Sequence, residues 1–230
     1  MATSSLLLLL ADGRFPAGAH AHSGGLEAAV AAGRVTDLAS LEAFLAGRLA
    51  TAGLVGAAFA AAAHRAVTSA GAAVRGSTLA LLDAELDART AAPALRTVSR
   101  RQGRALLRAG RAIWPAASFD DLPATAGGAH QPLVLGLLCA AAGLSRAETA
   151  TVAAHGTVTG AASAGVRLLG LDPYQVQALL VGLAGRCDGT AAEAARAADD
   201  PPERLPAAAA PLADIHAEAH ATWEVRLFAS

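Results

Sequence analysis

The sequence contains no lysine, so all 18 of its basic residues are arginines. A P-loop NTPase places a lysine on the β- and γ-phosphates of its nucleotide. A Schiff-base enzyme attacks its substrate with a lysine amine. The chain can carry out neither chemistry by itself. Its 18 basic residues stand against 19 acidic ones, which gives a formal net charge of −1. No overall positive field therefore points to a nucleic-acid partner.

Cysteine and aromatic residues are also scarce. The two cysteines, Cys139 and Cys187, form no Cys-x-x-Cys pair, which indicates free thiols in a reducing compartment. The leucine run at residues 6–10 follows no positively charged segment, so we do not expect a signal peptide. The apolar run at residues 133–144 is too short to cross a hydrocarbon layer about 30 Å thick. We therefore expect a cytoplasmic protein without a membrane partner.

Alanine and leucine dominate the sequence, and its apolar residues recur at helical spacing. No stretch of convincing length alternates polar and apolar residues. We therefore predict an all-α fold, with one compact multi-helix domain over residues 1–205. A Pro/Ala-rich linker and a helical C-terminal tail are expected over residues 206–230. The predicted helices cover residues 4–11, 24–33, 37–70, 78–89, 94–112, 132–142, 145–169, 172–198 and 212 onward.

Several residue patterns predict where these helices start and end. Thr36 or Asp37 is expected to cap one helix, and Ser77 is expected to cap the next. Ser145 and Glu148 have the spacing of a capping box, in which each side chain binds an open backbone amide of the first turn. Gly33 is expected to end its helix. Residues 114–128 are expected to form a surface loop.

One predicted helix carries a basic stripe. Its arginines recur at intervals of four residues, and no acidic residue stands between them in the sequence. The stripe could be a solvated helix face, a surface for an acidic protein or a nucleic-acid contact. The last reading supports an alternative function, an all-α DNA-binding or ligand-sensing regulator. The residues are Arg96, Arg100, Arg104 and Arg108, with Arg101 and Arg111 nearby.

A second stripe is polar and follows the predicted helix at residues 145–169. Small residues, Gly156, Gly160 and Ala164, run beside it and would allow a neighbouring helix to approach closely. The pattern is typical either of a packing helix with ordinary hydrogen bonds or of a polar interior path or interface. The polar stripe consists of His155, Thr159, Ser163 and Arg167.

Histidine pairs are the nearest approach to a metal site. His216 and His220 lie one helical turn apart and could share a metal ion, and His20 and His22 alternate in the first loop. Two ligands alone make a weak site, so we predict no metal centre and no cofactor. No nucleophile elbow, His-Glu-x-x-His motif or dinucleotide glycine fingerprint occurs in the sequence. We therefore do not expect an enzyme.

The C-terminal tail carries Trp223 and Phe228, although only 3% of the residues are aromatic. Aromatic and arginine side chains supply much of the energy at protein interfaces, so this segment is predicted to dock onto a partner. The tail is also one of five segments that each resemble a motif of one protein family. The five segments follow one another along the chain in the same order as the motifs of that family. These are Phe15–Glu27, Leu82–Leu86 followed by Arg89–Thr90, Ser99–Arg104, His155–Leu168, and His220 followed by Arg226–Ser230.

Together these segments resemble the UreF family of urease accessory proteins. The first segment is similar to the family's Pro-x-Gly-Gly-aromatic-x-x-Ser-x-Gly-Leu-Glu pattern, but Ala19 and His20 replace the usual glycine and aromatic residue. In the tail, Ala221 and Glu224 replace a usual glutamate and aromatic residue, and Leu171-Asp172 replaces a usual Gly-Gln pair further upstream. The loop signature consists of Phe15, Pro16, Gly18, Ser23, Gly25, Leu26 and Glu27.

This resemblance implies an all-α protein that dimerises and has a non-enzymatic role in urease maturation. The implied partners are the UreD/UreH scaffold protein, the GTPase UreG and apo-urease. The family's role implies regulation of GTP hydrolysis by UreG and assistance in nickel delivery. The tail is implied to bind the scaffold. The residues implied in partner binding are Arg167, His220, Trp223, Arg226, Leu227 and Phe228.

Overall fold

Every regular element in the computed structural model, which describes residues 4–16, 18–69 and 71–229, is helical. This confirms the predicted all-α class. Short 3₁₀ turns at Ala19–Ala21, Phe119–Asp121 and Pro202–Arg204 interrupt the connections. The helices are α1 (Ser4–Ala11), α2 (Leu26–Ala31), α3 (Leu38–Arg48), α4 (Leu54–Ser69), α5 (Ala72–Arg89), α6 (Pro93–Ile113), α7 (Gln131–Ala141), α8 (Arg146–Leu169), α9 (Pro173–Ala197) and α10 (Pro211–Ala221).

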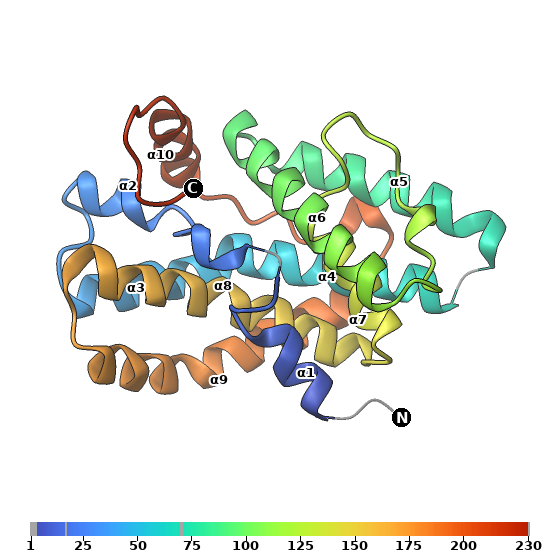
Figure 1. Cartoon of the computed structure of the whole chain (residues 1–230), viewed down its shortest axis with the longest axis horizontal. Helices are drawn as coiled ribbons and strands as arrows, with labels where there is room; N and C mark the ends of the chain where they lie inside the picture. Colours follow the sequence, from blue (N-terminus) through green and yellow to red (C-terminus); the bar gives the residue numbers. More distant parts are fainter. Residues whose placement is uncertain (1–3, 17, 70, 230) are drawn as a thin grey trace.

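Helix α4 forms the centre of the fold, with α5, α7, α8 and α9 packed against it (Figure 1). Every residue from Ala57 to His64 is buried, and most of them are alanines. Because alanine side chains are short, neighbouring helices can pack close to α4 on several sides. A helix that is apolar all round in this way is typical of a protein core.

Helices α3 and α4 form one continuous helix from Leu38 to Ser69, as the sequence predicted. At Leu49–Gly53 the backbone widens into a π-helical turn, which the sequence analysis did not predict. By length and composition alone this helix could cross a membrane. Its second half is the buried core of the fold, so packing against other helices accounts for its apolar character.

Of the two candidate caps, Thr36 and Asp37, the structure selects Asp37, and the predicted cap at Ser145 is confirmed. The Asp37 carboxylate accepts from the Ser40 amide at 2.8 Å. Ser145 and Glu148 form the expected capping box, in which the Glu148 carboxylate accepts from the Ser145 amide at 2.7 Å. Gly33 adopts a positive φ of 66° where α2 ends, which fits the predicted helix stop.

Two predicted boundaries were wrong. Helix α5 begins at Ala72, so Ser77 lies inside it, and the Ser77 hydroxyl donates to the Val74 carbonyl at 2.9 Å instead of capping the helix. The tail is helical only as far as Ala221. Beyond that point the amides of Leu227 and Phe228 donate to a side chain from α2, so they are not available for helical hydrogen bonds.

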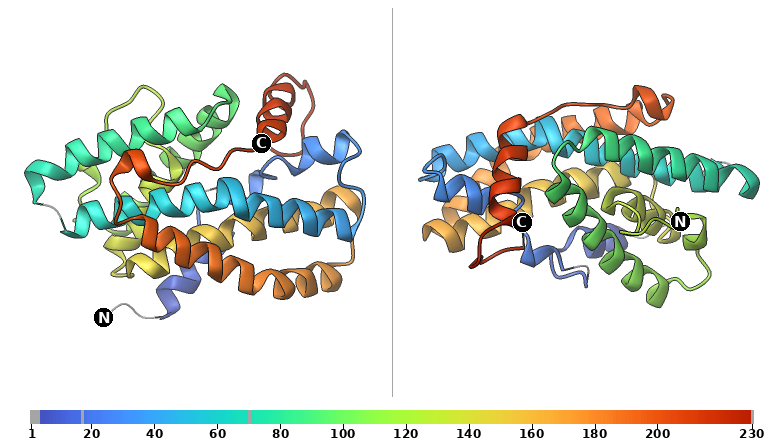
Figure 2. Two further views of the ribbon diagram at one scale, coloured as in Figure 1. Left: turned by 180° about the vertical axis from the view of Figure 1, so that it is seen from behind. Right: turned by 90° about the horizontal axis from the view of Figure 1, so that it is seen from above.

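The linker after α9 runs across the outside of the molecule before α10 packs beside α2 and α6 (Figures 1 and 2). The Arg89 guanidinium holds its first part, because Nη2 donates to the Glu203 carbonyl at 3.0 Å and to the Pro202 and Leu205 carbonyls at 3.3 Å. Leu205 is buried. These contacts direct the tail back toward the N-terminal part of the chain.

The closest helix contacts do not occur at the predicted small residues of α8. A Cβ atom at Gly156 or Gly160 would meet no other atom within 4 Å in the described part of the chain. Close approach occurs instead at Gly136 in α7, where a Cβ would lie 2.3 Å from the Ala60 carbonyl oxygen of α4. Gly156 and Gly160 therefore face open space, and α4 and α7 are in tight contact at Gly136.

We predict that Gly136→Ala lowers the free energy of unfolding by at least about 2 kcal/mol, because α7 must move away from α4 to admit the methyl group. The matched control is Gly156→Ala, which should be neutral or stabilising by about 0.5–1 kcal/mol because alanine favours the helix. Urea unfolding followed by circular dichroism measures both. Equal effects of the two substitutions would contradict this account of the packing.

Candidate functional site

The Glu27 carboxylate joins the first turn of α2 to the C-terminal tail. Its side chain is 9% exposed. One oxygen accepts from the Leu227 amide at 2.8 Å, and the other accepts from His220 Nε2 at 2.9 Å and the Phe228 amide at 3.0 Å. One side chain thus binds three groups that lie about 200 residues further along the chain. We refer to Glu27, His220, Leu227 and Phe228 as the tail junction.

The tail junction favours an ionised Glu27. Burial by itself would raise the pKa of this carboxyl group, but the hydrogen bonds from the Leu227 amide, His220 and the Phe228 amide outweigh burial and hold the pKa below its ordinary value. The start of α2 is fixed as well, because the Ser23 hydroxyl accepts from the Glu27 amide at 3.2 Å. Gly25, with φ at 90°, supplies the left-handed turn before the helix.

Aromatic side chains of the tail complete the junction. The Phe228 ring is buried, and the Arg167 guanidinium of α8 lies 4.9 Å from its centroid, which is a cation–π distance. Trp223 packs on His220, with 4.7 Å between the ring centroids. The Ala229 amide donates to the Ala21 carbonyl of the first loop at 2.7 Å. Residues from the first loop, α8 and the tail therefore meet in one place.

The structure brings together only part of the predicted site. Pro16 is exposed near Phe15, which is buried, and Arg226 is exposed beside a smaller cavity between α6 and α10. His216 is half-buried and has no part in the tail junction, whereas His220 Nε2 is bound to Glu27. Among the described residues no group of three or more His, Cys, Asp or Glu side chains could hold a metal ion. Ala17 and Ser230, which belong to the quoted segments, lie outside the described residues.

The polar stripe on α8 lines a cavity of about 760 Å³. The loop around Phe15, His20 and His22 lies on its other side, and Phe228 of the tail closes one edge. The stripe predicted from the sequence is therefore a surface facing a cavity. The stripe residues on the cavity wall are His155, Thr159, Ser163 and Arg167.

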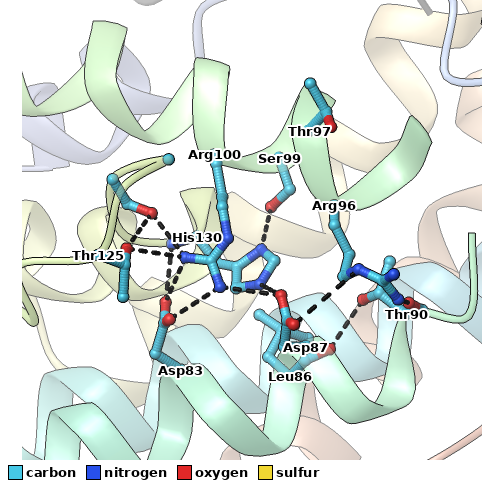
Figure 3. A network of polar contacts seen from close by, with 12 residues as sticks. Asp83, Leu86, Asp87, Thr90, Arg96, Thr97, Ser99, Arg100, Thr125 and His130 are labelled. Carbon is cyan, nitrogen blue, oxygen red and sulfur yellow. Dashed lines mark hydrogen bonds and ion pairs between the residues drawn. The ribbon is translucent and has the colours of Figure 1, made fainter. Parts of the chain in front are cut away.

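Two arginines of the basic stripe, Arg96 and Arg100, pair with acidic residues of α5, which the sequence analysis did not foresee. Arg100 Nη2 lies 3.0 Å from an Asp83 oxygen and 2.8 Å from an Asp87 oxygen (Figure 3). Arg96 pairs with Asp87 at 3.9 Å, and Arg111 pairs with Asp120 at 2.6 Å. Arg101, Arg104 and Arg108 are exposed and form no ion pair within the described part of the chain. The stripe is thus only partly free, and the DNA-binding alternative is not favoured. The spacing of four residues between Asp83 and Asp87, which matches that between Arg96 and Arg100, was the available signal.

His130 fills the centre of the same network. Its Nε2 donates to Asp87 at 3.0 Å, and its Nδ1 faces the Ser99 hydroxyl at 3.0 Å (Figure 3). Burial lowers the pKa of His130 despite the nearby carboxylates, so the neutral ring is favoured. The Asp83 carboxylate accepts from the His130 amide at 3.1 Å. The network holds α5, α6 and the start of α7 together.

These features define an all-α protein in which the tail packs against the N-terminal part of the chain and buried polar groups hold the helices and the tail in place. The family model of UreF matches residues 35–184. A urease accessory protein UreF from Mycobacterium sp. (strain JLS) is 45% identical over 230 residues, which is the whole of both chains.

Two further relatives carry the same name. The protein from Mycolicibacterium vanbaalenii is 44% identical over the whole of both chains. That from Mycobacterium tuberculosis (strain H37Rv) is 44% identical over 196 residues, which cover 84% of this chain and 86% of the relative. The chain therefore belongs to the UreF family of urease accessory proteins. Membership implies a role in urease maturation.

We predict that Glu27→Gln lowers the free energy of unfolding by about 1–3 kcal/mol at neutral pH, because a buried amide group cannot accept all three hydrogen bonds. Glu42→Gln, at an exposed position of α3, is the control and should change little. Chemical unfolding at several pH values measures both variants.

The same pair of variants tests the protonation of Glu27. Since its pKa is lowered in the folded chain, the stabilisation is present above the unfolded value of about 4.3 and is lost as pH falls through the folded value. The difference between the unmodified chain and Glu27→Gln should therefore shrink between about pH 5 and pH 3. A difference that stays constant over this range would show that Glu27 is not the titrating group.

Proposed function

We propose that this chain is a non-enzymatic urease maturation factor that binds the UreD/UreH scaffold protein, the GTPase UreG and apo-urease. It regulates GTP hydrolysis by UreG and assists nickel delivery to apo-urease. It acts in the cytoplasm as a homodimer. Relatives named urease accessory protein UreF, aligned with this chain from end to end, support the proposal.

The tail junction is the observation that carries the proposal. It holds the tail in a defined position while leaving apolar side chains exposed along it. Leu227 is 65% exposed although its amide is bound to Glu27, and Val225 is 85% exposed. Leu212 and Ile215 of α10 are exposed as well. Apolar side chains that are ordered but uncovered suit a docking surface, which we assign to the scaffold protein.

The absence of lysine supports a regulatory role toward a GTPase. This chain lacks the lysine that a P-loop places on the β- and γ-phosphates, so any GTP hydrolysis in which it takes part must use the loop of another protein. Binding to UreG supplies that loop. The proposal thus assigns nucleotide chemistry to the partner and positioning to this chain.

We predict that replacing both Val225 and Leu227 with serine weakens binding to the scaffold protein about tenfold or more, because it removes apolar contact area without removing a backbone amide. Calorimetry with the purified scaffold protein measures the loss. The melting temperature should be unchanged, because both side chains are exposed in the free chain. Val181→Ser, at a 76% exposed position of α9, is the matched control and should leave binding unchanged.

Phe228→Ala provides the contrast. This substitution should weaken scaffold binding and also lower the melting temperature by several degrees, since a buried ring is lost. Full scaffold binding by both the serine variant and Phe228→Ala would reject the tail as the docking surface. An unmodified chain that binds neither the scaffold protein nor UreG would reject the proposed function itself.

A further inference from the structure

The cavity beside α8 has the size of a ligand-binding pocket, at about 760 Å³. One wall is α8, and the other comes from the first loop and from the end of α3 at Arg48. Ser99 of α6 and Gln131 of α7 also line it. The edge formed by Phe228 places the cavity directly beside the tail junction.

The charged lining of this cavity is mostly positive. Its arginines are Arg14, Arg48 and Arg167, and Asp12 is its acidic residue. Asp12 and Arg14 pair with each other at 2.8 Å, so their charges cancel. Neither Arg48 nor Arg167 forms an ion pair within residues 4–16, 18–69 and 71–229. The cavity therefore has two guanidinium groups without a counter-charge.

Arg48 is the more constrained of the two. Its Nη1 donates to the Gly24 carbonyl, whereas its Nε is enclosed and has no hydrogen-bond partner among the described residues. Burial lowers the pKa of the Arg48 guanidinium to about 10, so the group remains charged at neutral pH. The Phe44 ring lies over the guanidinium, with 5.9 Å between Cζ and the ring centroid, but no described carboxylate pairs with it. A buried charge without a counter-charge is destabilising. An anion in the cavity would supply that counter-charge.

The shape of the cavity favours a peptide over a small ion. The α8 wall carries Gly156 and Gly160. A Cβ atom built at either position would have no neighbouring atom within 4 Å among the described residues. Without side chains at these positions, another backbone can lie close to α8. His155, Thr159 and Ser163 supply polar groups along the same wall. A volume of about 760 Å³ also exceeds what one inorganic anion fills.

We propose that this cavity binds an acidic segment of a partner protein in the maturation complex, with carboxylates of that segment on Arg48 and Arg167. Guanidinium groups pair with carboxylates through two parallel hydrogen bonds, which gives both attraction and orientation. This inference rests on the proposed function, because the segment belongs to one of the proposed partners. Arg167 also contacts the Phe228 ring of the tail. The same arginine would therefore contact both the bound segment and the tail.

Arg48→Gln and Arg167→Gln test the proposal in the full chain. Each variant should bind either the scaffold protein or UreG about tenfold or more weakly, because each loses a partner of an enclosed charge pair. The dependence of that binding on salt should become shallower. Arg186→Gln, at an exposed α9 position outside the cavity, is the matched control and should bind normally. Circular dichroism and thermal melting check that each variant is folded.

The contact of Arg167 with the tail requires a separate control. Phe228→Leu removes the cation–π contact but keeps the positive charge in the cavity. Under the proposal it should retain the salt dependence of partner binding that Arg167→Gln loses. If Phe228→Leu reproduces the effect of Arg167→Gln and Arg48→Gln has none, Arg167 acts through the tail, and the proposal is overturned.

A peptide competition tests the unmodified chain, which also covers the case that Arg48→Gln fails to fold. A polyglutamate peptide should displace the partner whose binding depends on the cavity, and a polylysine peptide should not. Displacement by inorganic phosphate at equal total charge would identify a small-anion site and overturn the proposal. Loss of the homodimer in the arginine variants, without loss of partner binding, would assign the cavity to a second copy of the chain and also overturn it.

Two failures remain distinguishable. If the unmodified chain binds neither proposed partner, the proposed function fails. If the unmodified chain binds its partners and both folded arginine variants bind them equally well, only the assignment of this cavity fails.

Discussion

The buried carboxylate of Glu27 is the interaction on which the arrangement of the chain's ends depends. It accepts hydrogen bonds from His220 and from the amides of Leu227 and Phe228, and these bonds hold the last residues against α2. A buried carboxylate without such partners would be strongly destabilising. The hydrogen bonds that satisfy Glu27 therefore also hold the end of the tail in a defined position. In this position the Val225 and Leu227 side chains point into solvent.

Polar groups have a corresponding role on the other side of the core. The alanine-rich α4 lets its neighbours pack closely but offers little to determine how α5 and α6 align. The network of Asp83, Asp87, Arg100 and His130 supplies that specificity, since each charge has few alternative partners (Figure 3). Arg48 in the α8 cavity differs from these networks, because no described carboxylate pairs with it and its Nε has no hydrogen-bond partner among the described residues.

Much of the fold could be predicted from residues close together in sequence. The caps at Asp37 and Ser145 depend on atoms three residues apart, so local pattern was sufficient. The start of α5 was mistaken because Ser77 has the chemistry of a cap, although its hydroxyl bonds back to Val74 inside a helix. The pairing of Arg100 in the basic stripe was missed because its acidic partners belong to the preceding helix. The site was predicted as separate motifs, and the contact between Glu27 and the tail was not.

The sequence by itself determined the all-α class, most helix positions, the exclusion of lysine-dependent chemistry and the resemblance to UreF proteins. These follow from composition, helical periodicity and short motifs, which are local properties of the chain. Only the tertiary structure decided that Glu27 holds the tail, that Arg96 and Arg100 are neutralised, and that Arg48 and Arg167 face one cavity. Each of these depends on which residues distant in sequence become neighbours, and helix packing determines that.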